Sequence, residues 1–189
     1  MFNQVSVDGF FKSLDGDVSW THEQAPDAEF EDWVAANASG GGALLFGRAT
    51  YEMMASFWPT PMAAAQMPVV AKHMNELPKI VFSRTLTSAS WQNTHLVKGD
   101  LVAEVKKLKS EARKDLGGEK PITIMGSGSI VTQLAKHGLI DEYQILVIPV
   151  ILGAGAPLFE GPGKKQNLRL TRSRTFKNGK AYLVYEPSA

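Results

Sequence analysis

Short apolar runs alternate with segments of helical period along most of this chain, and this alternation constrains the fold more than any other feature. Runs such as 43–46, 79–82 and 122–125 have the length and apolar character of buried strands. The segments between them carry apolar residues three and four positions apart, which is typical of helices with one buried face. The sequence therefore predicts an α/β fold, mainly a parallel sheet with helices on both faces.

The expected elements can be placed along the chain. The predicted strands are 2–7, 43–46, 79–82, 95–97, 122–125, 142–150, 168–176 and 181–185. The predicted helices are 27–37, opened by Pro26; 50–56; a helix that carries Leu101, Val105, Leu108 and Ala112 behind an N-cap at Asp100; and 129–136, which stops at Gly138. A loop is expected over 8–24, with a turn at 15–17. Residues 177–180 read as a hairpin turn, so the last two strands are expected to be antiparallel.

Composition limits the size and the surroundings of the protein. A chain of 189 residues with 44% hydrophobic content suits a single domain over residues 1–189. Its 20 Lys and Arg against 19 Asp and Glu give a net charge of +1, so we expect neither nucleic acid nor a membrane as a partner. The absence of cysteine excludes disulfides and thiolate chemistry. Without a signal-peptide pattern or a long apolar run, a cytoplasmic protein is expected.

Three predicted strands end in residues that suit phosphate groups. The segments are Gly47-Arg48-Ala49-Thr50, Ser83-Arg84, and Gly126-Ser127-Gly128-Ser129 followed by Ile130. Helix N-termini after strands offer unpaired N–H groups, glycine permits close backbone approach, and a guanidinium pairs well with phosphate. Taken alone, each segment is also explained by an ordinary turn or cap. Because all three fall on strand ends of one predicted sheet, a single extended nucleotide could contact all of them.

The last glycine segment departs from the fingerprint of Rossmann dehydrogenases. Val131 stands at the third glycine position, and no acidic residue follows at a distance of about 20 positions. The four histidines, 22, 73, 95 and 137, are scattered without ligand spacing, so we expect no catalytic metal. A generic Rossmann dehydrogenase is therefore the weakest of the enzyme hypotheses.

Four segments together carry a family resemblance. They are LLFGRATYEMM, MNELPKIVFSRTL, IMGSGSIVTQLAKHGLIDEYQILVIPVILGAGAPLF and SRTFKNGKAYLVYEP, in chain order. In this combination the chain resembles the dihydrofolate-reductase-like family that includes the RibD C-terminal reductase domain of riboflavin biosynthesis. The resemblance implies a mixed eight-stranded sheet with NADPH across strand ends. It places the 2′-phosphate near Arg48, Ser83 and Arg84, the pyrophosphate between Thr50 and residues 126–129, and the nicotinamide toward Val5 and Trp20.

Three residues near the N-terminus are candidates for contact with a substrate. Trp20 resembles the tryptophan of the first active-site loop in this family, although a loop aromatic that packs at the core edge is the structural alternative. Asp27 falls where dihydrofolate reductases hold a carboxylate that assists protonation, but directly after Pro26 it also suits a helix cap. Asp8, in Ser6-Val7-Asp8-Gly9, either shapes the substrate corner or turns the chain.

The leading functional hypothesis is an NADPH-dependent reductase that transfers hydride to a small heterocyclic or imine-like substrate. A relative of the 5-amino-6-(5-phosphoribosylamino)uracil reductase comes first, a dihydrofolate reductase second, and a non-catalytic NADPH-binding module is the alternative from another class. Met125 and Val18 stand where the riboflavin enzymes carry a glutamate and a polar contact, which leaves the substrate open. By resemblance, a homodimer is expected through the apolar segment 145–152 and residues 153–159.

Overall fold

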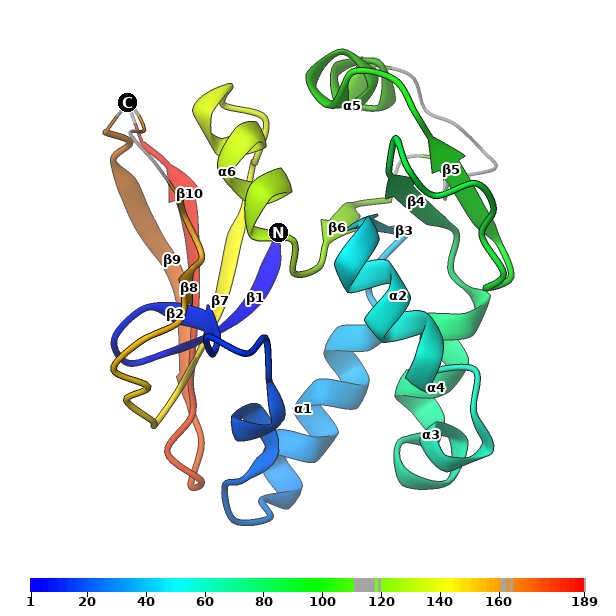
Figure 1. The fold of residues 1–189 in the computed structure, drawn as a ribbon. Coiled ribbons are helices and arrows are strands. Elements are labelled where there is room, and N and C mark those ends of the chain that lie inside the picture. The colour runs from blue at the N-terminus through cyan, green and yellow to red at the C-terminus, as the bar shows by residue number, and fades with distance from the viewer. Residues whose placement is uncertain (111–117, 119, 161–162, 164, 189) are drawn as a thin grey trace. The chain divides into compact units, whose positions relative to one another are not determined.

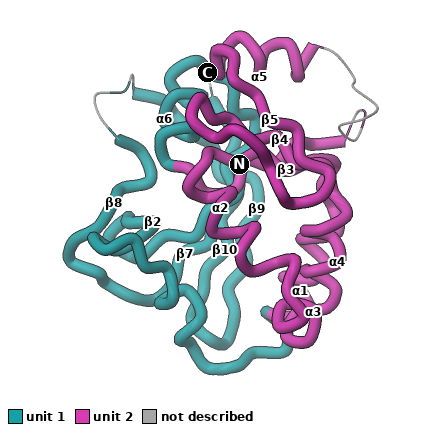
Figure 2. Tube along the Cα trace, turned by 45° about the vertical axis from the view of Figure 1, so that its right-hand side comes forward, with its two compact units in different colours: residues 1–30, 128–189 teal, residues 31–127 magenta. Residues whose placement is uncertain are grey.

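The structure is a computed structural model that describes residues 1–110, 118, 120–160, 163 and 165–188 (Figure 1). The chain divides into two compact units (Figure 2). Unit 1 comprises residues 1–30 and 128–189, and unit 2 comprises residues 31–127. Each unit has its own four-stranded sheet, and one domain over residues 1–189 stays a prediction.

The sheet of unit 2 is parallel throughout, in the order β5-β4-β3-β6. Its strands are β3 (Ala43–Gly47), β4 (Lys79–Phe82), β5 (Thr94–Val97) and β6 (Ile122–Ile124). Ala43 to Phe46 are all buried, as expected of a central parallel strand whose two faces are both covered. The core on one side contains Phe46, Tyr51 and Trp91, packed with other apolar side chains. The four strands predicted for this region are confirmed within a residue at each end.

Helices of unit 2 follow these strands. They are α2 (Arg48–Phe57), α3 (Pro61–Gln66), α4 (Pro68–Glu76) and α5 (Leu101–Ser110), and α1 (Ala28–Ala38) enters this unit from unit 1. Asp100 caps α5 as predicted, because its carboxylate accepts from the Ala103 N–H at 2.9 Å. The predicted helix position Ala112 lies outside the described residues. The short helices α3 and α4 were not predicted; each opens on a proline, which suits the first helical position.

The sheet of unit 1 is mixed, in the order β1-β7-β10-β9. Its strands are β1 (Phe2–Ser6), parallel to β7 (Tyr143–Ile148), and β10 (Ala181–Pro187), antiparallel to both β7 and β9 (Leu168–Thr175). The unit also holds α6 (Gly128–Lys136), the 3-10 turn η1 (Ser19–His22), and the short pair β2 (Phe10–Lys12) and β8 (Ala156–Pro157). Neither β2 nor β8 is long enough to leave a periodic signal in the sequence.

The fold class is confirmed as mixed α/β with a C-terminal antiparallel hairpin. The eight longer strands are hydrogen-bonded as two sheets of four, whereas the resemblance implies one sheet of eight. The predicted hairpin turn is present: the Phe176 N–H donates to the Lys180 carbonyl at 2.9 Å, and Gly179 has a φ of 83°. A positive φ at this position favours glycine.

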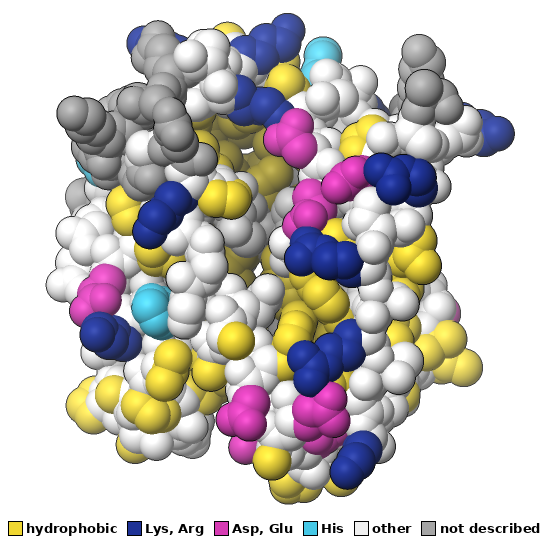
Figure 3. Space-filling view, turned by 180° about the vertical axis from the view of Figure 1, so that it is seen from behind, with side chains coloured by type: hydrophobic (Ala, Val, Ile, Leu, Met, Phe, Trp, Pro, Cys, Tyr) yellow, Lys and Arg dark blue, Asp and Glu magenta, His cyan; other side chains and the backbone are white. Residues whose placement is uncertain are grey.

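Charged side chains of both signs are interspersed on the surface. On the face shown in Figure 3, Lys and Arg lie beside Asp and Glu, and no large field of one sign covers it. On β9, for example, Arg172 pairs with Glu142 at 2.7 Å and Arg174 with Glu29 at 2.7 Å. Among the described residues no helix is long and apolar enough to cross a membrane.

One lysine is fully buried at the start of β4. The Lys79 side chain is 0% exposed, and its Nζ donates to the carbonyls of Asn75 at 2.8 Å, Leu77 at 2.8 Å and Gln92 at 3.2 Å. The ammonium also lies 4.4 Å from the Trp91 ring centroid. Lys79 therefore ties the end of α4 to the segment that precedes β5, and burial lowers its pKa to about 8.

Replacing Lys79 by Met is expected to lower the free energy of unfolding by about 2 kcal/mol or more. Three carbonyl oxygens would lose a charged donor, and a hydrogen bond to a charged group typically contributes roughly 1.5–3 kcal/mol. Urea unfolding followed by circular dichroism measures the change. The matched control is Lys72→Met on the exposed face of α4, which should change stability by less than about 0.5 kcal/mol. Equal, small effects of both substitutions would contradict a structural role for Lys79.

The same variant gives a pH test. Because the pKa of Lys79 is about 8 in the folded protein and 10.5 ordinarily, the folded protein binds fewer protons than the unfolded chain between these values. The contribution of Lys79 to stability should therefore rise as the pH goes from 8 to 10.5. The stability difference between wild type and K79M should grow over that interval, and a constant difference would be inconsistent with the lowered pKa.

Candidate functional site

The carboxyl ends of three strands meet at one edge of the unit 2 sheet. Strand β3 pairs in parallel with both neighbours, so that Gly47 lies opposite Phe82 of β4 and Leu45 lies opposite Ile124 of β6. The segments that leave this edge are 47–50, 83–84 and 126–127. The predicted placement of these segments at the strand ends of one sheet is therefore confirmed. In open parallel sheets this edge is where ligands bind.

The loop after β6 packs tightly against the start of α2. Gly126 has a φ of 59°, and a Cβ at this position would lie 2.9 Å from Thr50 Cγ2 and 3.0 Å from Thr50 Oγ1. Any larger residue would push the Thr50 side chain away or shift the loop. Position 126 therefore requires glycine both for its backbone conformation and for its contact with Thr50.

The Ser127 hydroxyl joins two of the predicted segments. It accepts from the Gly47 N–H at 2.7 Å and donates to Thr50 Oγ1 at 2.9 Å. Ser127 itself has a φ of 60°, which is uncommon for a residue other than glycine. The 47–50 segment, which forms the N-terminus of α2, is thus in direct contact with residues 126–127.

The segment after β4 lies next along the same edge. Ser83 is half-buried and its hydroxyl accepts from the Leu86 N–H at 2.9 Å, so it caps the turn that follows β4. Arg48, Ala49 and Arg84 are exposed. Both guanidinium groups therefore leave strand ends at an edge where their side chains are accessible to an anion.

The remaining residues predicted to bind the cofactor belong to unit 1. Gly128, Ser129 and Ile130 form the first turn of α6, and Val5 is in β1. Gly128 is buried, and a Cβ there would lie 2.9 Å from Phe11 Cε1. The side chains of Val5 and Ile130 are 8% and 4% exposed. These two side chains belong to the core, so any polar contact they make is through the backbone.

Asp27 caps helix α1. Its Oδ1 accepts from the N–H groups of Glu29 at 3.1 Å and Phe30 at 3.3 Å, and its Oδ2 accepts from the Asn178 N–H at 3.1 Å. Burial favours a raised pKa for this carboxyl, but the backbone donors outweigh it, led by Asn178, and the net pKa is lowered. The cap that the sequence left as an alternative is therefore present, and it favours the ionised carboxylate over a proton donor.

The Trp20 side chain is buried in η1 and is hydrogen-bonded to the nearby backbone. The side chain is 4% exposed, and its Nε1 donates to the Asp17 carbonyl at 3.2 Å. The Gln24 side chain donates to the Trp20 carbonyl at 3.0 Å. The indole is thus buried, in line with the alternative of a loop aromatic that packs at the core edge. A contact of Trp20 with substrate stays a prediction.

Asp8 links the end of β1 to the segment after β7. It accepts from Ser6 Oγ at 2.6 Å and from the N–H groups of Leu152 at 3.2 Å and Gly153 at 2.8 Å. The hydrogen bond from Ser6 is the largest cause of its lowered pKa. These contacts fit the turn-shaping alternative for Asp8, and its catalytic role stays a prediction.

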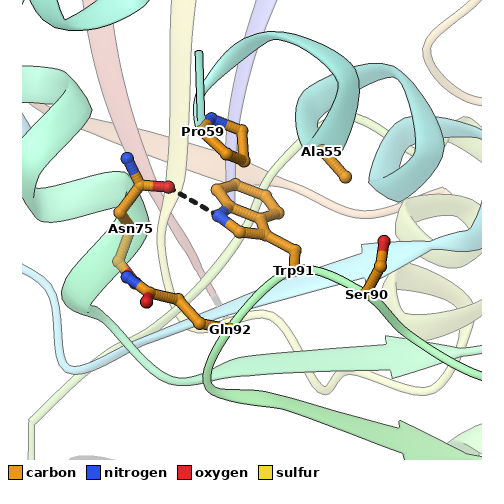
Figure 4. A pocket seen from close by; sticks show the side chains of 6 residues that line it. All are labelled: Ala55, Pro59, Asn75, Ser90, Trp91 and Gln92. Carbon is orange, nitrogen blue, oxygen red and sulfur yellow. Dashed lines mark hydrogen bonds between the residues drawn. The ribbon is translucent and has the colours of Figure 1, made fainter. Parts of the chain in front are cut away.

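Unit 2 also contains a pocket that was not predicted from the sequence (Figure 4). Its volume is about 470 Å³, and it is lined by Ala55, Pro59, Asn75, Ser90, Trp91 and Gln92. The Asn75 amide donates to the carbonyls of Trp58 and Ala71 and accepts from Trp91 Nε1 at 2.7 Å. Both the N–H and the oxygen of the Asn75 amide thus bond to other groups of the protein. The pocket lies beside the segments that precede β4 and β5. In the sequence, the only sign of the cluster of Asn75, Lys79 and Trp91 beside this pocket is the lysine at the start of the apolar run KIVF.

Comparison with known proteins decides the family. The model of the RibD C-terminal domain matches residues 1–182. This chain belongs to the RibD C-terminal domain family. The family consists of reductase domains, so the chain is placed among reductase-like proteins.

Relatives of this RibD C-terminal domain protein are found among curated sequences and solved structures. The uncharacterized protein YyaP of Bacillus subtilis (strain 168) is 30% identical over 96% of this chain and 90% of its own length. YwjB of the same organism is 28% identical over 93% and 90%. A Shewanella sp. PV-4 protein provisionally assigned to riboflavin biosynthesis has a TM-score of 0.76 at 24% identity, covering 100% of this chain and 97% of that one. A pyrimidine reductase-like protein of Corynebacterium diphtheriae gives 0.59 at 14%, covering 100% and 90%.

These structural likenesses support the fold of the RibD C-terminal domain. At 24% and 14% sequence identity, these similarities do not indicate which substrate the protein uses. Among the described residues no group of three or more His, Asp or Glu side chains is arranged to hold a metal ion.

Replacing Asp27 by Ala is expected to lower the melting temperature, because the amides of Glu29, Phe30 and Asn178 would lose their acceptor. Differential scanning calorimetry measures the change, with the exposed α1 residue Asp32 replaced by Ala as control. Since the pKa of Asp27 is held below its ordinary value of 3.8, its stabilisation is fully present above that pH. It is lost as the pH falls through the lowered value, so wild type and D27A should converge in acid. Equal melting temperatures of D27A and D32A at neutral pH would refute the cap.

Proposed function

We propose that this protein is an NADPH-dependent reductase that acts on a small heterocyclic or imine-like substrate. The observation that carries the proposal is the convergence of residues 47–50, 83–84 and 126–127 at the carboxyl edge of one parallel sheet. This edge combines a helix N-terminus, the hydroxyl groups of Thr50, Ser83 and Ser127, and two exposed guanidinium groups. Such a set suits a ligand with several phosphates.

The residues at this edge fit a dinucleotide diphosphate. Gly126 has no Cβ, so its loop packs directly against the half-buried Thr50 side chain and holds that side chain at the edge. Helix α2 runs from Arg48 to Phe57, long enough for its N-terminal N–H groups to attract an anion. We assign the diphosphate to this corner, between Thr50 and the 126–127 loop.

The same edge offers a place for a 2′-phosphate. Arg48 follows β3 and Arg84 follows β4, and these strands are hydrogen-bonded neighbours. A guanidinium forms two parallel hydrogen bonds with a phosphate, which a ribose hydroxyl cannot replace. We therefore assign the 2′-phosphate to Arg48, Arg84 and the Ser83 hydroxyl, and we expect NADPH to be preferred over NADH.

In the proposed reaction, bound NADPH supplies a hydride to the carbon of a C=N or C=O bond, and the nitrogen or oxygen receives a proton. The chain binds and orients the cofactor at the edge described above. Asp27 is held ionised by backbone donors, so a neutral carboxylic acid at this position is not the expected proton source. Contacts of Asp8, Trp20 and Asp27 with the substrate stay predictions.

Within this class, family membership favours a substrate like the ribosylaminopyrimidine of riboflavin biosynthesis over dihydrofolate. Met125 stands where the riboflavin reductases carry a glutamate, so we propose the reaction class and leave the ring system open. A screen of such compounds that follows NADPH absorbance identifies the substrate. If NADPH binds tightly and no compound oxidises it, the alternative of a non-catalytic NADPH-binding module gains.

Replacing Arg48 or Arg84 by alanine is expected to weaken the binding of NADPH and to leave the binding of NADH nearly unchanged. Arg48→Ala and Arg84→Ala should each raise the Kd for NADPH about tenfold, since a charge-assisted hydrogen bond is worth roughly 1.5 kcal/mol or more. Fluorescence titration with both cofactors measures the effect. Arg169→Ala, on the exposed strand β9 of unit 1, is the matched control. Equal affinity of the wild type for NADPH and NADH would overturn the assignment of the 2′-phosphate.

We also propose a homodimer through the segment that follows β7. Ile151 is 73% exposed and Phe159 is 46% exposed. Large apolar side chains exposed together often mark a protein–protein interface. Light scattering at micromolar concentration should give twice the 20.6 kDa chain mass, and Ile151→Asp should shift the protein toward that single-chain mass. A wild-type protein that is monomeric under these conditions would refute the dimer.

A further inference from the structure

Three groups at the edge of unit 2 form a hydrogen-bond chain with a fixed direction. The Gly47 N–H donates to Ser127 Oγ at 2.7 Å, and Ser127 Oγ donates to Thr50 Oγ1 at 2.9 Å. A backbone N–H can only donate, and a hydroxyl has one proton. Because Ser127 Oγ donates its single proton to Thr50 Oγ1, the proton of Thr50 is directed elsewhere.

The Thr50 side chain is held from a second side as well. Gly126 lies so close that a Cβ there would be 2.9 Å from Thr50 Cγ2, which fixes the methyl group of the threonine. With its methyl against Gly126 and its oxygen bonded to Ser127, Thr50 has little rotational freedom. No group in the described part of the chain accepts the proton of Thr50, and the side chain is only half-buried.

Ser127 keeps this arrangement at a conformational cost. Its φ of 60° lies in the left-handed region, where a non-glycine residue is disfavoured. Glycine would suit this backbone better but would lack the hydroxyl that connects Gly47 with Thr50. A strained residue whose side chain joins two loops at a ligand-binding edge points to a functional requirement for that side chain.

We propose that Ser127 is a positioning residue that aims the Thr50 hydroxyl proton at the diphosphate of the bound dinucleotide. Thr50 makes the contact with the ligand, and Ser127 acts through Thr50. This inference rests on the proposed function and changes the role expected for Ser127, which the sequence counted among the residues that contact the cofactor. The hydrogen-bond chain from Gly47 polarises the final hydroxyl and strengthens its donation to an anionic oxygen.

Two simple ligands separate the corners of the site. ADP carries a diphosphate and no 2′-phosphate, whereas adenosine 2′-monophosphate carries the reverse. Thr50→Val keeps the shape of the side chain and should raise the Kd for ADP about tenfold, the loss expected for a hydrogen bond to a charged group. Ser127→Ala should raise it about fivefold. Neither variant should change the Kd for adenosine 2′-monophosphate, measured by isothermal titration calorimetry.

The double variant distinguishes positioning from contact. If Ser127 acts only through Thr50, adding Ser127→Ala to the Thr50→Val protein should leave the Kd for ADP unchanged. If the two effects multiply, Ser127 contacts the diphosphate itself and the inference is wrong. An unchanged Kd for ADP in Thr50→Val would overturn it as well.

A third variant separates binding from folding. Ser127→Gly removes the hydroxyl and suits the positive φ, so it should keep the wild-type melting temperature while weakening ADP as Ser127→Ala does. Ser56→Ala is the matched control, because Ser56 is an exposed serine on the same helix as Thr50. It should change neither quantity. A Ser127→Gly protein with wild-type affinity for ADP would show that the hydroxyl is dispensable.

These measurements distinguish a failure of the role proposed for Ser127 from a failure of the proposed function. If the wild type prefers NADPH in an Arg48-dependent manner but Ser127→Ala has no effect on ADP, only the role of Ser127 fails. If the wild type binds neither NADPH nor ADP, the proposed function fails and this inference falls with it. If ADP binding follows the predicted pattern without any preference for NADPH, the positioning role stands and only the 2′-phosphate assignment is lost.

Discussion

Strand β3 hydrogen-bonds in parallel to β4 on one side and to β6 on the other, and the candidate site depends on this pairing. Parallel alignment brings the carboxyl ends of all three strands to one edge, although the segments they feed are up to 80 residues apart in sequence. The distance between Gly47 and Ser127 is then short enough for a direct hydrogen bond. An antiparallel arrangement of β6 would send residues 126–127 to the opposite edge and leave Thr50 without its partner.

Buried polar groups in both units serve structure in a similar way. In unit 2, Lys79 donates to carbonyls near the end of α4, and in unit 1 Lys180 donates to the Thr21 carbonyl of η1; burial lowers the pKa of both lysines. In unit 1, Lys180 lies 4.2 Å from the Phe30 ring centroid, and Asp27 binds the neighbouring Asn178 N–H. These contacts fasten the segment before α1 to the β9–β10 turn. A lowered pKa in this protein is thus a sign of packing as well as of chemistry.

Much of the fold could be read from the sequence because its strands are short apolar runs flanked by turn residues. The strand KIVF was predicted with its observed bounds, and Asp100 was recognised as a helix cap. The two-residue strand β8 and the six-residue helix α3 were not predicted, because they carry too few positions to show a strand or helix period. The shared edge was predicted from strand order, but the direct contact of Ser127 with Thr50 depends on a backbone conformation at residues 126–127 that residue types alone do not specify.

We propose that the carboxyl edge of the unit 2 sheet binds the phosphates of NADPH. NMR chemical-shift mapping with NADP⁺ tests it most directly, because each backbone amide reports on its own surroundings. We expect the largest shifts at the amides of residues 47–50, 83–84 and 126–127, with little change around Trp91. Shifts concentrated on the pocket beside Trp91, or spread without preference for the strand ends, would contradict it.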